Sequence, residues 1–116
     1  MRLAQKLNLK DGMKVRVVGK PAGIDLDDVV VTSSAQADAI LVFVKTVADV
    51  DKMRGPVVDV AKADRLAWIA YPKARQLGTN LNRDILWRHL LKQHIQGVRQ
   101  VPIDDVWSAM RFRPGK

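Results

Sequence analysis

Four short segments rich in apolar residues alternate with more polar ones over the first two thirds of the chain, and this pattern predicts the strands of a sheet. The segments are 14–18 (KVRVV), 29–32 (VVVT), 39–44 (AILVFV) and 66–71 (LAWIAY). The last two are apolar throughout, which is typical of strands that are covered on both faces. We therefore expect a mostly parallel sheet with 39–44 at its centre.

Three segments have the three- and four-residue apolar spacing of amphipathic helices, namely 2–7, 46–61 and 83–95. Thr46 is expected to cap the second helix, and Asn82 or Thr79 the third. Gly97 supplies the stop after the third helix. Pro56 is expected to kink or split the second.

The end of the chain predicts a β-hairpin with strands 98–103 and 106–112. In the second strand, Trp107 and Ala109 should face one way and Met110 and Phe112 the other. Asp104 and Asp105 lie at its tip, where turn geometry favours them and is a simpler explanation than an acid-base pair. Pro102 cannot donate to a ladder on both sides, so its strand should lie at the edge. Right-handed crossovers then give the strand order 2-1-3-4-6-5 with the last strand antiparallel. The predicted fold is a single three-layer α/β domain over 1–116, with helices on both faces.

Several motifs resemble a family of small bacterial proteins of uncharacterised activity. They are LAWIAYPK, TNLNRDILW and IDDVWSAMRFRP, together with the opening LAQKLNLKDGMKVRVVG. Members of that family begin with a KLG-type helix and a strand, and end in a W-V-A-Y-P-K strand and a D-D-x-W-S-A-L-R-F-R hairpin. The family is similar in turn to a reduced class I methyltransferase scaffold. The resemblance therefore implies a Rossmann-like, methyltransferase-like sheet, and it implies no particular reaction.

The chain departs from methyltransferases at the positions where their cofactor binds. In those enzymes the first strand leads into an acidic, glycine-rich loop such as D-x-G-x-G, whereas residues 17–23 read VVGKPAG. A ribose-binding acid usually follows their second strand, whereas 32–34 read TSS. We therefore expect no S-adenosylmethionine and no other cofactor, and we favour a binding function over an enzymatic one.

Three of the predicted strands are followed within two residues by a lysine, namely Lys20, Lys45 and Lys73. Open α/β sheets bind ligands at the carboxyl ends of their strands, so these cations are expected to meet at one rim. The helices that begin near Thr46 and Asn82 would direct their positive ends to the same side. The predicted site takes a small anionic or phosphate-bearing ligand and consists of Lys20, Ser33, Lys45, Tyr71, Lys73 and Arg83. The simpler alternative is that the lysines only end the apolar strands and keep this edge of the sheet soluble.

The formal net charge of +8 is unevenly distributed along the chain. Residues 1–58 hold nine basic and seven acidic side chains, and residues 59–116 hold eleven and five. Such an excess attracts nucleic acid by counterion release, so a nucleic-acid-associated protein stays open as an alternative. A small enzyme that uses Lys20 or Lys73 as base or nucleophile is another. An ordinary basic surface is the simpler interpretation of the charge.

Histidines and tryptophans have predicted structural roles. His89 and His94 are five residues apart, about 140 degrees around a helix at ~100 degrees per residue, so we expect no shared metal. His89 should face solvent, and Trp68 and Trp107 should lie in the core. The inward stripe of the third helix is predicted to be Leu86, Trp87, Leu90, Leu91 and His94.

The composition excludes cysteine chemistry, and the apolar pattern of the chain suggests its cellular compartment. The chain has no cysteine, which removes disulfides, thiolate nucleophiles and cysteine-ligated zinc. Ser108 has no base placed beside it by the sequence, so a catalytic role is unsupported. The longest apolar run, 39–44, is too short to cross a bilayer, and the start of the chain lacks the pattern of a signal peptide. We expect a cytoplasmic protein with no membrane partner, and the oligomeric state stays open.

Overall fold

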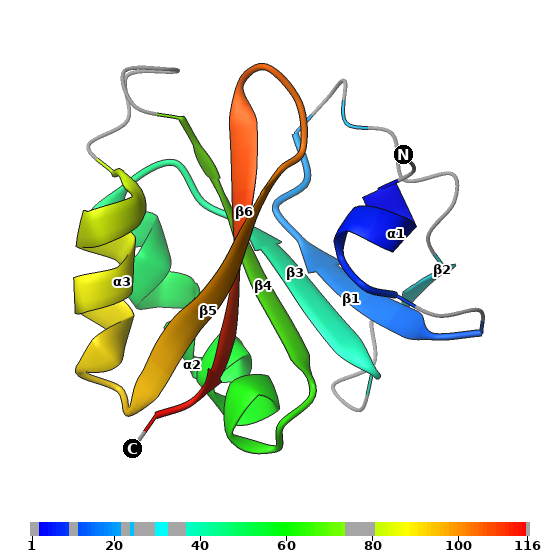
Figure 1. Ribbon diagram of the computed structural model, residues 1–116, viewed down its shortest axis with the longest axis horizontal. Helices are drawn as coiled ribbons and strands as arrows, with labels where there is room; N and C mark the ends of the chain where they lie inside the picture. Colours follow the sequence, from blue (N-terminus) through cyan, green and yellow to red (C-terminus); the bar gives the residue numbers. More distant parts are fainter. Residues whose placement is uncertain are drawn as a thin grey trace.

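A computed structural model of the chain describes residues 3–9, 12–21, 24, 30–32, 37–73 and 81–115. These residues form a mixed six-stranded sheet in the order β2-β1-β3-β4-β6-β5 (Figure 1), so the predicted α/β class and strand order are confirmed. The strands are β1 (Lys14–Val18), β2 (Val30–Thr32), β3 (Ala39–Phe43), β4 (Leu66–Pro72), β5 (Ile95–Pro102) and β6 (Trp107–Pro114). The first four pair in parallel, and β6 is antiparallel to both β4 and β5.

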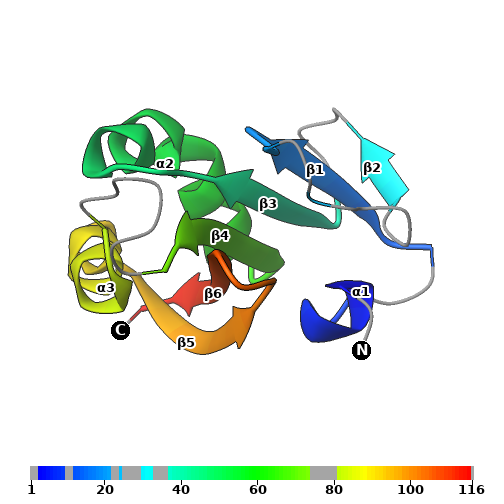
Figure 2. The same cartoon turned by 90° about the horizontal axis from the view of Figure 1, so that it is seen from above.

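Each face of the sheet carries its own apolar core. On one face, helices α2 (Val47–Lys62) and α3 (Arg83–Leu91) cover a cluster that includes Met110 and Phe112. On the other face lies α1 (Leu3–Lys6) (Figure 2). Leu7, directly after it, packs in a cluster with Trp107 and Ala109. The predicted alternation of β6 between the two faces is confirmed. Within the described ranges, the expected helical cover of the second face consists of α1 alone.

Helix α2 begins as predicted and does not split. The Thr46 hydroxyl accepts a hydrogen bond from the Asp49 amide at 3.2 Å, and the Asp49 carboxylate accepts one from the Thr46 amide at 3.3 Å. The helix continues through Pro56 to Lys62. Proline inside a helix costs about 3 kcal/mol or more, and burial of Val57 against the sheet helps to offset that cost. None of the helices in the described part of the chain has the length and apolarity that a membrane crossing requires.

Helix α3 ends earlier than predicted. It stops at Leu91, and His94 adopts a positive φ of 65° that turns the chain into β5 at Ile95. The reason is long-range, because β6 continues to Pro114 and Ile95 pairs with that residue. Gly97 is therefore not a helix stop and lies within β5.

Several predicted orientations on and just after α3 are also wrong. Trp87 is 43% exposed, Leu91 is 50% exposed and His94 is exposed, so the buried stripe of α3 consists of Leu86 and Leu90. His89, predicted to face solvent, is partly buried, and its Nε2 lies 2.6 Å from Oδ1 of Asp51 on α2. This hydrogen bond lowers the pKa of Asp51 from its usual value. It joins the two helices that cover one face.

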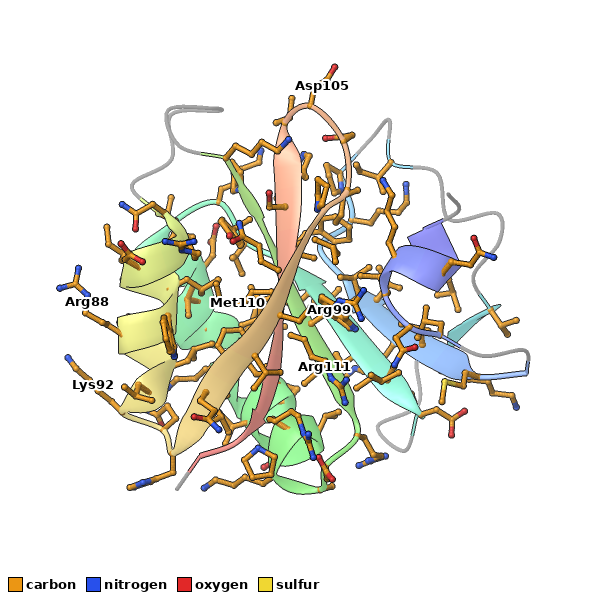
Figure 3. The ribbon with its side chains drawn as sticks, in the orientation of Figure 1. Arg88, Lys92, Arg99, Asp105, Met110 and Arg111 are labelled. Atoms are coloured by element: carbon orange, nitrogen blue, oxygen red, sulfur yellow. The ribbon has the colours of Figure 1, made fainter. Side chains whose placement is uncertain are left out.

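The predicted hairpin and its turn are confirmed, although its strands are 95–102 and 107–114 instead of 98–103 and 106–112. Oδ1 of Asp104 accepts hydrogen bonds from the amides of Val106 and Trp107, each at 2.8 Å, which stabilises the turn. Asp105 lies beside it at the tip (Figure 3). Strand β5, which ends at Pro102, forms the outer edge of the sheet. The turn role of the paired aspartates and the edge position of Pro102 are thereby confirmed.

Glycine is required where β1 ends. Gly19 has a φ of +75°, and a Cβ added there would lie 2.9 Å from the backbone oxygen of Phe43 in β3. Gly12 has a similar φ of +83°, but a Cβ added there would meet no described residue within 4 Å. The two positions thus share the left-handed backbone and differ in available space.

Alanine substitutions at these glycines should separate the two effects. Gly12→Ala should cost about 1–2 kcal/mol from left-handed strain alone. Gly19→Ala should cost about 1 kcal/mol more, because the neighbouring carbonyl belongs to a central strand that cannot move freely. Urea unfolding with a common m-value measures both. Equal losses at the two positions would show that the contact with Phe43 is relieved without cost.

Candidate functional site

The carboxyl ends of β1, β3 and β4 lie at one end of the sheet, because these strands are parallel. The predicted orientation of the three strands is therefore confirmed. Among the described residues, two hollows lie at this end of the sheet. The first lies where β4 ends, and the second lies between the ends of β1 and β3.

The first hollow, which we name the β4 pocket, has a volume of about 390 Å³. It receives side chains from the end of β4, the start of α3 and both strands of the hairpin. The residues that line it are Tyr71, Lys73, Asn82, Arg83, Asp84, Gln100 and Ser108. Three of the predicted site residues, Tyr71, Lys73 and Arg83, are brought together here.

The polar floor of the β4 pocket is fixed by strand pairing. Tyr71 lies opposite Ser108 in the ladder between β4 and β6, and both are almost fully buried. Nε2 of Gln100 donates a hydrogen bond of 2.7 Å to the Tyr71 hydroxyl oxygen. The amide of Lys73 donates to the carbonyl of Val106 at 2.7 Å, which holds the chain beyond β4 against the hairpin. These hydroxyl and amide groups are thus positioned by the sheet.

Burial raises the pKa of Tyr71 to about 12. The charge of Arg83 acts in the opposite direction, and that of Asp84 raises the pKa further. The phenol is therefore neutral at physiological pH. Because its oxygen accepts from Gln100, its hydrogen is left as a donor.

The start of α3 forms the charged side of the β4 pocket. Oδ1 of Asn82 caps the helix by accepting from the Ile85 amide at 2.9 Å. Nε of Arg83 lies 3.4 Å from Oδ1 of Asp84, and both side chains are mostly exposed. Together with Lys73, the pocket lining carries two cations and one carboxylate. The balance favours an anion, and the helix start adds a positive dipole end.

The second hollow, which we name the β1–β3 hollow, has a volume of about 250 Å³. Lys45 and Lys52 line it above the ring of Trp107. The strand order reverses between β1 and β3, and such switch points commonly bind ligands. Here, however, the Asp49 carboxylate accepts from the Lys45 amide at 3.0 Å and from the Thr46 amide, so a negative charge already occupies the start of α2.

The remaining predicted residues lie elsewhere or are not described. Nζ of Lys20 donates to the carbonyls of Pro21 and Ile24, at 3.3 and 3.0 Å, and so bonds within its own loop. Ser33 lies outside the described residues. In the described part of the chain, Lys45 and Lys73 therefore line different hollows, and Lys20 lines neither of them.

Sequence reasoning missed several residues of the β4 pocket. The face occupied by Ser108 could have been predicted, since in a strand Ser108 alternates with Trp107 and Ala109 and so shares a face with Met110. Gln100 had none, because a register shift between Gly97 and Arg99 decides which face it occupies. Asn82 was predicted only as a helix cap.

Comparison of the chain with protein-family models, curated proteins and solved structures found no match. Within the described ranges, no three His, Cys, Asp or Glu side chains are grouped closely enough to hold a metal ion. A functional interpretation therefore rests on the geometry and charge of the β4 pocket.

The titration of Tyr71 provides a direct test of this pocket, because it is the only tyrosine in the chain. In the folded protein, the absorbance of tyrosinate should appear with a midpoint near pH 12, against about 10 in urea. Because the pKa is raised in the folded state, the contribution of the buried phenol to the free energy of unfolding is complete below about pH 10 and falls as the pH rises toward 12. Circular dichroism at each pH reports whether the chain is folded, and Tyr71→Phe supplies the baseline. A midpoint near 10 in folded protein would contradict the buried position.

Proposed function

We propose that this chain is a non-enzymatic binding domain that takes a small phosphate-bearing ligand in the β4 pocket. One observation carries the proposal: Lys73 and Arg83 line the same pocket as the hydroxyl and amide groups of Tyr71, Gln100 and Ser108. Cations supply affinity for an anion, and neutral donors at fixed positions supply orientation.

The donors in the pocket suit phosphate oxygens, which accept hydrogen bonds in several directions. The ammonium of Lys73 and the guanidinium of Arg83 give charge-assisted bonds, which are about twice as strong as neutral ones. Tyr71 acts as a neutral donor because burial raises its pKa to about 12. Each helix has one aspartate in its first turn, but Asp49 of α2 accepts from the backbone amides of Lys45 and Thr46, whereas Asp84 of α3 lies 3.4 Å from Nε of Arg83. Of the two helix starts, α3 is therefore the better prepared for an external anion.

The fold we infer is a degenerate Rossmann-like, methyltransferase-like domain, related to the small bacterial proteins that the motifs resemble. The strand order and the closing antiparallel hairpin support this assignment. The loop after β1 supports a binding rather than a methyl-transfer role. Gly19 packs against the carbonyl of Phe43, and Lys20 bonds to carbonyls of its own loop, so both are engaged within the protein.

Calorimetric titration with inorganic phosphate and nucleoside monophosphates tests the proposal. The double variant Lys73→Gln with Arg83→Gln should lower the association constant at least about tenfold, since bonds to charged groups each contribute roughly 1.5–3 kcal/mol. Lys45→Gln with Lys52→Gln is the matched control. Each pair lowers the formal net charge from +8 to +6, and the control pair lies in the neighbouring β1–β3 hollow.

The two variants separate a specific site from general attraction. The control should bind within about twofold of the unchanged protein. Equal losses in both variants would show that only net charge matters, as expected for non-specific nucleic-acid binding. A loss confined to the control would assign the ligand to the β1–β3 hollow and refute the proposal, as would absence of binding to every phosphate tested.

A further inference from the structure

Three large apolar side chains are exposed where α3 meets the edge of the sheet. Trp87 is 43% exposed, Leu91 50% and Val98 46%. The other two tryptophans, by contrast, are 1% and 4% exposed. A large aromatic side chain left in solvent commonly marks an interaction surface. We name Trp87, Leu91 and Val98 the α3–β5 surface.

The members of this surface are neighbours in space. Trp87 and Leu91 are four residues apart on α3 and so share one side of the helix. Cδ1 of Trp87 would lie 3.7 Å from a Cβ built on Gly97, which places the indole over β5 at the residue before Val98. The surface therefore runs continuously from α3 onto the edge strand.

The strand beside it has a free edge. β5 is the last strand of the sheet, and no strand in the described part of the chain pairs with its outer side. The register shift between Gly97 and Arg99 leaves Val98 as the extra residue of a bulge. Backbone donors and acceptors on such an edge are available to a partner segment.

Positive charge flanks the α3–β5 surface on both sides. Figure 3 shows Arg88 and Lys92 pointing outward from α3, and Arg99 and Arg111 on the opposite side of β5. Arg99 lies directly opposite Arg111 in the ladder. Nε of Arg111 is buried and has no hydrogen-bond partner among the described residues.

Among the described residues, the nearby acids have other partners than these four cations. On α3, Asp84 lies 3.4 Å from Arg83. Asp51 is hydrogen-bonded to His89 on the side of α3 that faces α2, and Asp64 forms two bonds to Arg113. The surface is thus apolar at its centre and positive at its margins.

We propose that the α3–β5 surface docks an acidic segment of another protein. Apolar side chains of that segment pack on Trp87, Leu91 and Val98, and its carboxylates face the flanking cations. A second copy of this chain is the poorer occupant, because pairing two β5 edges would bring two Arg99 side chains and two molecules of charge +8 together. The β4 pocket lies at the first turn of α3 and the two proposals are independent.

Selection from a random peptide library against the whole protein tests the proposal. The enriched peptides should carry Asp or Glu around apolar residues. Their synthetic versions should shield Trp87 from iodide quenching, a local signal because Trp87 is the only exposed tryptophan of the three. The affinity of these peptides should fall as salt is raised.

Two serine variants that retain Trp87 locate the binding. Leu91→Ser with Val98→Ser should weaken the selected peptides about tenfold or more. The matched control, Val30→Ser with Val31→Ser, changes two valines that are each 54% exposed on the opposite edge strand and should leave affinity unchanged. Arg88→Gln with Lys92→Gln, which alters only exposed side chains, should weaken binding and its salt dependence even where the serine variant folds poorly.

Several outcomes would overturn the proposal. They are enrichment of no peptide, enrichment of basic or uncharged peptides, and equal affinity in the Leu91/Val98 and Val30/Val31 variants. Sedimentation that shows self-association abolished by Leu91→Ser with Val98→Ser would assign the surface to a second copy. Unstructured RNA that protects Trp87 in place of any acidic peptide would assign it to nucleic acid.

Discussion

Strand β4 pairs in parallel with β3 and antiparallel with β6, and this change of direction determines where the rest of the molecule lies. All seven of its residues are buried, so it can carry both ladders and both cores. Because β6 runs the opposite way, its first residues stand beside the last residues of β4. Tyr71 and Ser108 thus meet at one end, and β5 brings Gln100 to the same place. A purely parallel sheet would give this end no side chains from a hairpin.

The two helix starts differ in a way that distinguishes two otherwise similar hollows. At α2, Asp49 supplies its own carboxylate to the amides of Lys45 and Thr46. At α3, the aspartate of the first turn, Asp84, lies 3.4 Å from Nε of Arg83, and the cap is the amide of Asn82. A helix start whose backbone amides already bind a carboxylate has less to offer an external anion. The bonding of the first-turn aspartate, more than the number of lysines, therefore separates the β4 pocket from the β1–β3 hollow.

Much of the fold could be predicted from the sequence because buried strand positions are occupied by apolar residues in a recognisable pattern. The apolar runs at 39–44 and 66–71 indicated central strands, and the alternation from Trp107 to Phe112 indicated both faces of β6. Tyr71, Lys73 and Arg83 were found because they stand at the end of a strand or the start of a helix. The limit of α3 was not predictable, since the helical spacing continues to Ile95 and only its pairing with Pro114 ends it. The partners of Lys20 were equally hidden, because a flexible side chain selects among carbonyls that only the folded loop presents.

Gly97 has a consequence beyond its own strand. A Cβ there would lie 2.6 Å from the sulfur of Met110, whose side chain is buried, and 3.7 Å from the indole of Trp87, which is exposed. Because Gly97 has no Cβ, the buried sulfur of Met110 and the exposed ring of Trp87 can both approach the backbone of β5 at this residue. Any side chain at position 97 would therefore disturb a buried residue and an exposed one together, so the interior packing and the outer surface depend on the same position.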